Sequence, residues 1–375
     1  LYNADIVYIS HNHPDHMHED TLIKLFQHRP DIPIVIPDFK TKSAERPLRS
    51  IGFTNVIPLA FNQIHKLGAH EIYISILKSG DFRDDSGLYI SYGQKQALIT
   101  VDSSALNHYV LPTDIDFLAT SFAAGASGHP WCFDHYSEDE KFQITHNRHL
   151  SLKKSIFKYI DTCKPRSYMP YAGYFSEAAL RDEYIKKNNI KNSQQSISEE
   201  IHNLYPDIIT IDPISTDKIT ISRSITTCSS DIDRPATSQD EIKKHLNKEQ
   251  MPNAEIFFNS AQEYFSSSQF KDDLILYLLP CESDFTPLEK GLIIDFSQQA
   301  ITKILHHQDV QSEYDSENCN LRQLCIKVRA TSLWQVIQHH KSWEELSIGF
   351  HCRIHRKPDV YNSDFWYHFS NIYIK

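Results

Sequence analysis

Apolar and polar positions follow two periodicities in the first half of the chain. Short apolar runs at residues 6–9, 33–37 and 56–59 predict buried strands, and segments 19–28 and 42–51 between them carry apolar residues at helical spacing. Later runs predict a helix at 150–159 and further strands at 71–77, 87–92, 97–101, 116–120 and 167–171. Strands that alternate with helices indicate an α/β layered fold.

The pattern changes beyond this region. Residues 186–203 are polar, a short strand is expected at 207–214, and residues 216–253 are rich in Ser, Thr, Asp and Lys with few aromatics. That composition predicts a linker with one short helix at 239–246. The remainder predicts helices at 256–265 and 330–338 and strands at 273–279, 291–296, 324–328 and 348–354. We therefore expect a domain at 1–215, a linker at 216–253, and a smaller α+β domain at 254–375. The aromatic tail 361–369 is expected to pack against the first domain, with the lining of a ligand pocket as the alternative.

Composition narrows the class of protein. The chain of 375 residues has 48 acidic and 38 basic residues, a formal net charge of -10, which argues against general nucleic-acid or acidic-membrane binding and leaves room for a local basic pocket. No apolar run approaches the ~20 residues that span a bilayer. The seven scattered cysteines form no Cys-x-x-Cys pair and no Cys-x-His partnered by Cys-x-x-His, which excludes a zinc ribbon or a Rieske cluster within these residues. Their odd number and scatter indicate reduced thiols in a cytoplasmic protein.

The densest chemistry lies directly after the first strand, in His11-Asn12-His13-Pro14-Asp15-His16. Imidazole and carboxylate are the preferred ligands of zinc, iron and manganese, and a loop at a strand end can direct them to one or two metals. The alternative is a surface cluster in a chain that already has 21 histidines. The strand, the spacing and the interposed Asp15 together favour a metal site.

Two further segments extend this candidate site. Asp102 follows the buried run 97–101, where α/β folds place their chemistry, although it could instead cap a helix. Gly125, Ser127 and Gly128 form a loop whose backbone can approach a ligand closely, with a tight strand-to-helix turn as the alternative. His129 and His135 are additional imidazoles nearby in sequence.

The spacing His-x-His-x-Asp-His after a strand resembles the metallo-β-lactamase superfamily. Four other segments, in the same order along the chain, resemble the CMP-N-acetylneuraminate hydroxylase family: residues 122–128, 165–175, 348–350 with 357–361, and 365–369. The resemblance covers essentially the whole chain. It implies a metallo-β-lactamase-type αββα sandwich without its opening strands, in a chain that we expect to be a fragment.

The resemblance also implies roles for individual residues. His11, His13, Asp15, His16 and Asp102 become metal ligands, with Asp102 as the bridging carboxylate and Asp15 and Asp102 as catalytic groups. Where relatives have a third histidine, Asp81 aligns best, and two histidines with one carboxylate suit non-haem Fe(II). A later histidine is replaced by a stretch whose one carboxylate is Glu177, so one firmly held metal is expected. The expected substrate-binding residues are Gly125, Ser127, Gly128, Tyr171 and Tyr174.

Three functions remain open from the sequence. The first is a metal-dependent oxygenase that acts on a nucleotide-linked sugar or a similar small anion. In the family it resembles, iron is expected ahead of zinc, and a 2Fe–2S Rieske cluster on a segment outside this chain, or a separate electron-transfer protein, supplies electrons. The second is a metallohydrolase of an ester, amide or phosphodiester, in which a metal-bound water attacks. The third is a non-catalytic scaffold whose metal site has degenerated.

Overall fold

The computed structural model describes residues 3–68, 71–124, 128–173, 177–211, 218–222, 225–228, 237–246, 250–316 and 319–372. The chain folds into two compact units that interleave along the sequence. The first unit comprises Leu1–Ala126, Thr145–Phe175 and Ile190–Ala236; the second comprises Ser127–Ile144, Ser176–Asn189 and Thr237–Lys375.

The first unit begins with a small parallel sheet. Its three strands, β1 (Val7–Tyr8), β2 (Ile34–Pro37) and β3 (Val56–Leu59), pair in sequence order. The helices α1 (Glu19–His28) and α2 (Glu45–Ile51) connect them, as parallel strands require a crossover. Gly52 ends α2 with φ of 120°, a conformation that disfavours any side chain.

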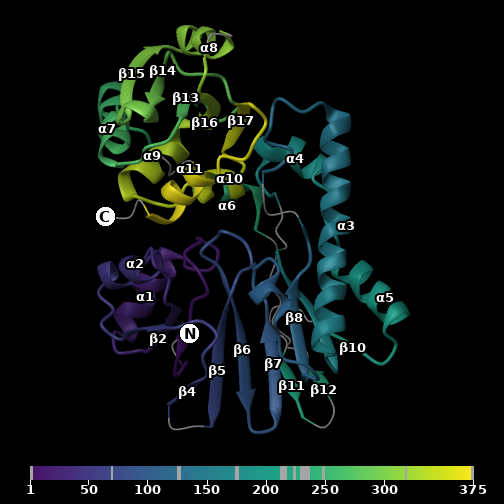
Figure 1. Cartoon of the computed structure of the whole chain (residues 1–375). Coiled ribbons are helices and arrows are strands. Elements are labelled where there is room, and N and C mark those ends of the chain that lie inside the picture. The colour runs from purple at the N-terminus through teal and green to yellow at the C-terminus, as the bar shows by residue number, and fades with distance from the viewer. Residues whose placement is uncertain are drawn as a thin grey trace. The chain divides into compact units, whose positions relative to one another are not determined.

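A second sheet of seven strands follows (Figure 1). Its order is β10-β9-β8-β7-β6-β5-β4; β4 to β7 form an antiparallel meander and β7 to β10 are parallel. The bounds are β4 (His65–Leu67), β5 (Ile72–Lys78), β6 (Ser86–Tyr92), β7 (Lys95–Ile99), β8 (Phe117–Ser121), β9 (Ser167–Ala172) and β10 (Ile209–Thr210).

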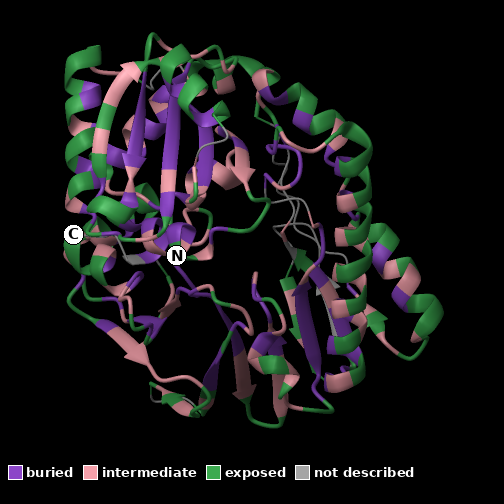
Figure 2. Ribbon diagram, turned by 45° about the horizontal axis from the view of Figure 1, so that its top comes forward, coloured by how far each residue is buried: buried purple, intermediate pink, exposed green. Residues whose placement is uncertain are grey.

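Side-chain alternation along the strands stacks these elements into layers. Ile34 and Ile36 of β2 pack with α1 and α2, whereas Val35 between them packs with Ile74 and Ile76 of β5 in the second sheet. The buried residues concentrate in the central strands, as Figure 2 shows. One sheet therefore lies on the other.

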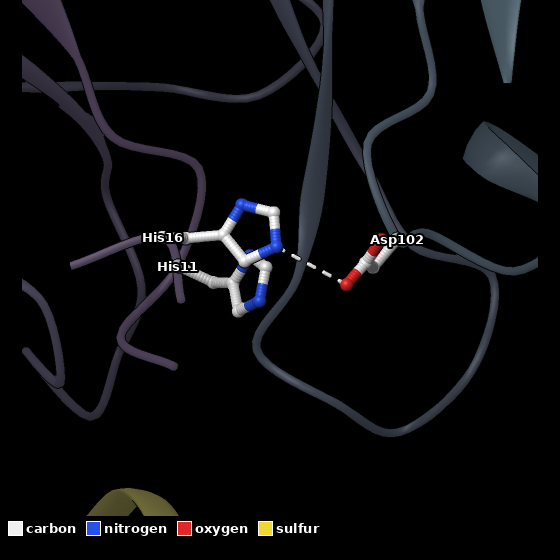
Figure 3. Close-up of side chains that lie close together, drawn as sticks. All are labelled: His11, His16 and Asp102. Carbon is white, nitrogen blue, oxygen red and sulfur yellow. Dashed lines mark hydrogen bonds and ion pairs between the residues drawn. The ribbon is translucent and has the colours of Figure 1, made fainter. Parts of the chain in front are cut away.

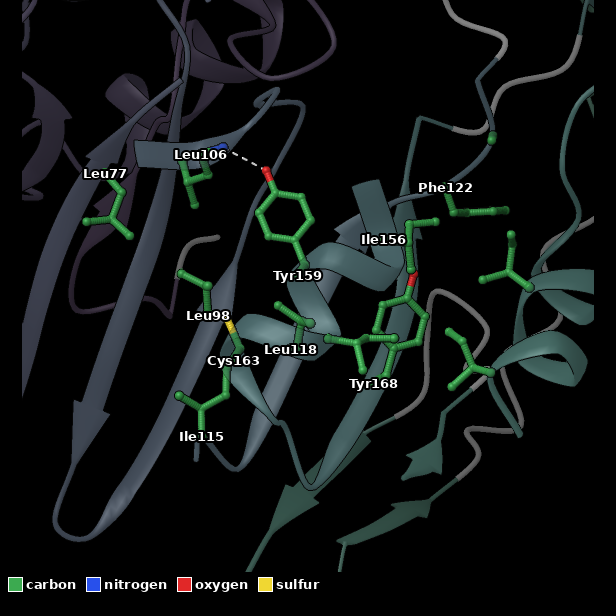
Figure 4. Packing of buried hydrophobic residues seen from close by; sticks show 14 residues of the cluster. Leu77, Leu98, Leu106, Ile115, Leu118, Phe122, Ile156, Tyr159, Cys163 and Tyr168 are labelled. Atoms are coloured by element: carbon green, nitrogen blue, oxygen red, sulfur yellow. Dashed lines mark hydrogen bonds between the residues drawn. The ribbon is translucent and has the colours of Figure 1, made fainter. Parts of the chain in front are cut away.

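The outer face of the seven-stranded sheet carries the fourth layer, formed by α3 (Glu138–Cys163) and α5 (Gln194–Leu204). Leu98 and Leu118 point toward Ile156 and Tyr159 of α3 (Figure 4). The hydroxyl of Tyr159 accepts a hydrogen bond of 2.7 Å from the amide of Leu106. This order of helices, sheet, sheet and helices confirms the predicted αββα sandwich.

The second unit is built on a mixed five-stranded sheet in the order β15-β14-β13-β16-β17, in which only β13 and β16 run parallel. Helix α7 contacts α9 and β15, and α8 packs on β13 and β14. The strands are β13 (Leu274–Cys281), β14 (Lys290–Asp295), β15 (Ile301–His306), β16 (Arg322–Arg329) and β17 (Cys352–Lys357). The longer helices are α7 (Ala254–Ser267), α8 (His307–Asp315) and α9 (Ala330–His339), and the shorter ones are α4 (Glu183–Asn188), α6 (Gln239–Leu246), α10 (Glu344–Ile348) and α11 (Ser363–Tyr367).

Aromatic residues fill the core of this unit. Phe365 and Phe369 pack on each other with ring centroids 4.9 Å apart, and each also contacts Phe296 and Trp343. The expectation that the aromatic tail serves to pack against the first domain was therefore wrong for these residues, which belong to the core of their own unit.

The structure departs from the sequence-based elements in four other places. The strand expected at 348–354 is β17 (Cys352–Lys357), and Ile348 ends α10. The helix expected at 150–159 extends over Glu138–Cys163, and the polar stretch 186–203 contains α5. The expected linker contains a hairpin of β11 (Lys218–Ile221) and β12 (Ile225–Cys228), and Ile219 and Ile221 pack against the seven-stranded sheet. The boundaries at 215 and 254 stay predictions, whereas the chain packs into the interleaved units above.

Among the described residues, no helix is both long enough and apolar enough to cross a membrane.

The core between the seven-stranded sheet and α3 should be sensitive to lost volume. Leu118 is fully buried there, so Leu118→Ala should lower the free energy of unfolding by about 2–5 kcal/mol, measured by urea denaturation. Ile64→Ala is the matched control because Ile64 is 72% exposed, and it should change stability by about 0.5 kcal/mol or less. Equal effects of the two substitutions would contradict this packing.

Candidate metal centre

The histidine loop begins where β1 ends. The amide of Ile9 still donates to Val35 O at 3.0 Å, and the chain then leaves the sheet with His11 fully buried. A turn follows, in which the amide of His16 donates to His13 O at 2.9 Å. This turn brings His13 and His16 back beside His11, with ring centroids 4.4 Å and 4.3 Å from its ring.

Asp102 reaches the loop from the second sheet. It lies beyond the end of β7, in a segment where Val101 has a φ of 52°, a strained conformation for a β-branched residue. Its Oδ2 lies 3.1 Å from Nε2 of His16 (Figure 3). Ligand atoms of His11, His16 and Asp102 all lie within 4.8 Å of one another, a spacing that one metal ion could bridge.

The protonation states of His11, His13 and Asp102 suit metal ligation. Burial lowers the pKa of His11 well below its ordinary value and that of His13 to about 4, so both rings are neutral at pH 7. For Asp102, burial raises the pKa, but the hydrogen bond and charge of His16 outweigh burial and the net pKa is lowered. Neutral imidazoles and an ionised carboxylate are the forms that bind metals. For His16, burial lowers the pKa, but the hydrogen bond and charge of Asp102 outweigh burial and the net pKa is raised, so metal binding at this ring would displace a proton.

Buried polar atoms without partners provide an independent test of fit. Nε2 of His11 and Oδ1 of Asp102 are buried and have no hydrogen-bond partner among the described residues. Such groups cost free energy unless something satisfies them, and a cation held between them would do so. The donor set therefore fits a divalent metal.

Asp85 is the residue that the sequence analysis missed. It is 1% exposed, and its Oδ1 lies 3.3 Å from Nδ1 of His11 and accepts hydrogen bonds from the amide of Ser86 at 2.6 Å and the hydroxyl of Ser103 at 3.3 Å. Burial raises its pKa to about 7. Its place directly before the buried strand β6 was the available signal.

Asp81 lies outside the group of His11, His16 and Asp102. Its carboxylate accepts hydrogen bonds from Nε of Arg83 at 2.9 Å and from the Arg83 amide at 3.1 Å. The same guanidinium donates to Asp102 O at 3.2 Å. Asp81 is thus linked to the centre through Arg83, and its role as a ligand stays a prediction.

The other described residues predicted to belong to the site lie outside the group of His11, His16 and Asp102. Asp15 is more than half exposed, with Oδ2 3.5 Å from Nε2 of His16. Tyr171 is 37% exposed, and burial of its hydroxyl raises its pKa. Gly128 belongs to the second unit, where a Cβ would meet Cys132 and Ser347 at 3.0–3.1 Å, so packing accounts for this glycine. Gly125, Ser127 and Tyr174 lie outside the described residues.

Two other residues considered from the sequence also belong to the second unit. Nε2 of His135 lies 3.1 Å from Asp359, and Glu177 accepts a hydrogen bond of 3.2 Å from Asn189. Neither contact involves the histidine loop.

Comparison with known proteins finds sequence relatives that align over almost the whole chain. No protein-family model matches the chain. The cytidine monophosphate-N-acetylneuraminic acid hydroxylases of Xenopus laevis and Macaca mulatta are 29% and 30% identical to it over alignments of 392 positions, which cover 99% of this chain and 64% of each relative. The human relative, described as an inactive hydroxylase, is 29% identical with 75% of its length covered.

Among solved structures, the diiron β-hydroxylase CmlA from Streptomyces venezuelae has a TM-score of 0.36 and 15% identity, covering 54% of this chain and 41% of that chain. The metallo-β-lactamase fold protein YhfI from Bacillus subtilis has a TM-score of 0.36 and 13% identity, covering 60% of this chain and 78% of that chain. The resemblance predicted from the sequence motifs is confirmed by the sequence relatives: the chain is a homologue of the cytidine monophosphate-N-acetylneuraminic acid hydroxylases, and spans 64% of the length of the first of these relatives.

Proposed function

We propose that this chain is the metal-binding part of an oxygenase that hydroxylates a nucleotide-linked sugar or a similar small anionic substrate. The observation that carries the proposal is the convergence of His11, His16 and Asp102, because two histidines and one carboxylate are the ligands of non-haem Fe(II) oxygenases with open positions. The homology supplies the reaction class, since the relatives are named as hydroxylases.

His11, His16 and Asp102 would hold the ion, through His11 Nε2, His16 Nε2 and the Asp102 carboxylate. When bound, iron supplies the activation of dioxygen, with electrons from a reductant or an electron-transfer protein. The chain's own residues hold these ligands ready. Burial keeps His11 neutral, and Arg83 fixes the backbone of Asp102 through its carbonyl oxygen.

Asp85 would act as a positioning residue in this site. Nδ1 of His11 has two oxygen neighbours, the Ser10 hydroxyl at 2.9 Å and the Asp85 carboxylate at 3.3 Å. The carboxylate can only accept, so it favours the tautomer with hydrogen on Nδ1, which leaves the lone pair of Nε2 for the metal. The hydrogen bonds from Ser86 and Ser103 fix the carboxylate in turn.

Two alternative functions predict a different metal content of the protein. A metallohydrolase would use the same ligands with zinc, so the metal found in the protein separates the two reactions. A scaffold with a degenerate site is supported by the description of the human relative as inactive. It predicts no stoichiometric metal.

Metal binding tests the proposal directly. The purified chain should bind about one Fe(II) anaerobically, measured by competition with a colorimetric chelator. The His11→Ala/His16→Ala variant should bind Fe(II) more than about 100-fold more weakly. Loss of a residue that only supports a ligand typically lowers metal affinity about 10–100-fold, and loss of two ligands should lower it further. His18→Ala is the control, because His18 is exposed in the same loop and contacts Thr21. The iron-loaded chain should then add oxygen to CMP-N-acetylneuraminic acid when supplied with dioxygen and a reductant, detected by mass spectrometry.

Tight binding of zinc but not iron, with ester hydrolysis, would establish the hydrolase instead. Absence of stoichiometric metal after reconstitution would leave the scaffold. Unchanged iron affinity in the double variant would show that the ion lies elsewhere in the protein.

Asp85 and Asp81 can be compared by the same titration. Asp85→Asn should weaken metal binding by about 10-fold or more, because an amide cannot enforce the required tautomer of His11. Asp81→Asn should have little effect, since its carboxylate contacts Arg83. A larger loss of metal affinity in Asp81→Asn than in Asp85→Asn would indicate instead that Asp81 is a metal ligand.

A further inference from the structure

The second unit carries basic side chains in register on one face of its sheet. Lys327 and Arg329 lie two residues apart on β16, and His351, Arg353 and His355 follow the same spacing along β17 and the residue before it. Because side chains alternate along a strand, each set points to one face. Lys327 pairs with Arg353, and the Arg329 amide donates to His351 O at 2.9 Å. Burial lowers the pKa of His351 to about 3 and also lowers that of His355, so the cations on this face are Lys327, Arg329 and Arg353. We name these three residues the basic strip.

Like charges directly opposite each other in an antiparallel pair destabilise a sheet, so each cation of the basic strip should have a compensating group. Arg329 has one: its Nη2 lies 2.7 Å from Asp182, with the guanidinium 1% exposed. Lys327 has a weaker one, because its Nζ lies 3.7 Å from a partly exposed carboxylate of Asp134.

Arg353 has no ion pair with a carboxylate in the described part of the chain. Its Nη1 donates hydrogen bonds to Cys352 O at 2.9 Å, Phe350 O at 3.3 Å and Cys132 Sγ at 3.5 Å. The ring of Phe285 lies 4.0 Å from its Cζ. These contacts hold the guanidinium in place but do not neutralise its charge.

A pocket of about 230 Å³ lies over this pair of cations. Strands β16 and β17 contribute Lys327, Arg353 and His355 to its wall, and α8 contributes Tyr314. The Tyr314 hydroxyl is in hydrogen-bond contact with Nδ1 of His355. When the hydroxyl donates to Nδ1, the ring carries its hydrogen on Nε2, and Nε2 can then donate to a bound group. Asp134 and Asp315 also line the pocket.

We propose that this pocket is an anion site that binds a compact phosphate group, as free phosphate or as a small phosphate monoester. Lys327 provides a point charge and Arg353 a planar set of donors, the combination that proteins use for phosphate. The bound group would offset the repulsion between the two opposed cations. The site is built wholly from the second unit and does not depend on the metal centre for its chemistry.

Calorimetric titration of the chelator-treated whole chain at low salt provides the test. Inorganic phosphate should bind saturably at one site, and Lys327→Gln and Arg353→Gln should each weaken binding by about tenfold, the loss expected for one charge-assisted contact. Asp134→Asn should have the opposite effect and tighten binding, because it removes the carboxylate that competes for Lys327. Ribose 5-phosphate should bind more tightly than inorganic phosphate if the pocket takes a monoester, and equally if it takes the free ion.

Lys290→Gln is the control for net charge, because Lys290 is exposed on β14 and absent from the pocket wall. It should leave phosphate binding unchanged. If Arg353→Gln fails to fold, as thermal unfolding would reveal, Lys327→Gln and Asp134→Asn decide the matter.

Three results would overturn the proposal: no binding by the unaltered chain, equal losses in Lys290→Gln and Lys327→Gln, or weaker binding in Asp134→Asn. Phosphate binding should persist in the His11→Ala/His16→Ala variant. Loss of phosphate binding in that variant would assign the anion to the metal centre instead. If that variant still binds metal, the result contradicts only the proposed oxygenase site.

Discussion

The hydroxyl of Ser86 joins the two sheets at the point where the metal-binding loop begins. It donates to Ser10 O at 2.8 Å and lies 2.7 Å from the hydroxyl of Tyr8; Tyr8 ends β1 and Ser10 follows it by two residues. Because Asp85 precedes Ser86 and His11 follows Ser10, the same junction sets the imidazole against the carboxylate. The geometry of the centre therefore depends on how the sheets stack, and its burial, which holds His11 neutral, is a consequence of that stacking.

Much of the sandwich could be predicted from periodicity, because its strands are short apolar runs and its chemistry follows two of them directly. Helix α3 was underestimated because polar residues dominate its first turns, so that only the part from residue 150 showed an apolar face. Alignment could not decide which carboxylate of residues 81–85 lies beside His11. Asp81 and Asp85 lie in one turn, and only its folded path directs Asp85 to His11 and Asp81 to Arg83.

The average charge of the chain also conceals its local arrangement. A net charge of -10 indicated an acidic protein, yet strand pairing gathers cations that are about 25 residues apart in sequence onto one face of β16 and β17. The alternate spacing of Lys327 and Arg329, and of Arg353 and His355, was visible in the sequence. What was missing was the register that places one set opposite the other.

The interleaving of the two units limits how this protein can be taken apart or recombined. Asp182 lies in a segment that precedes most of the second unit by more than fifty residues, yet it neutralises Arg329 in the interior of that unit. A fragment cut at residue 254 would keep the buried guanidinium and lose its carboxylate, and an unpaired buried charge costs roughly 3–5 kcal/mol. In evolution, the carboxy-terminal sheet is therefore not a module that can be exchanged by a single crossover, and any shuffling event must carry both of its distant segments with it.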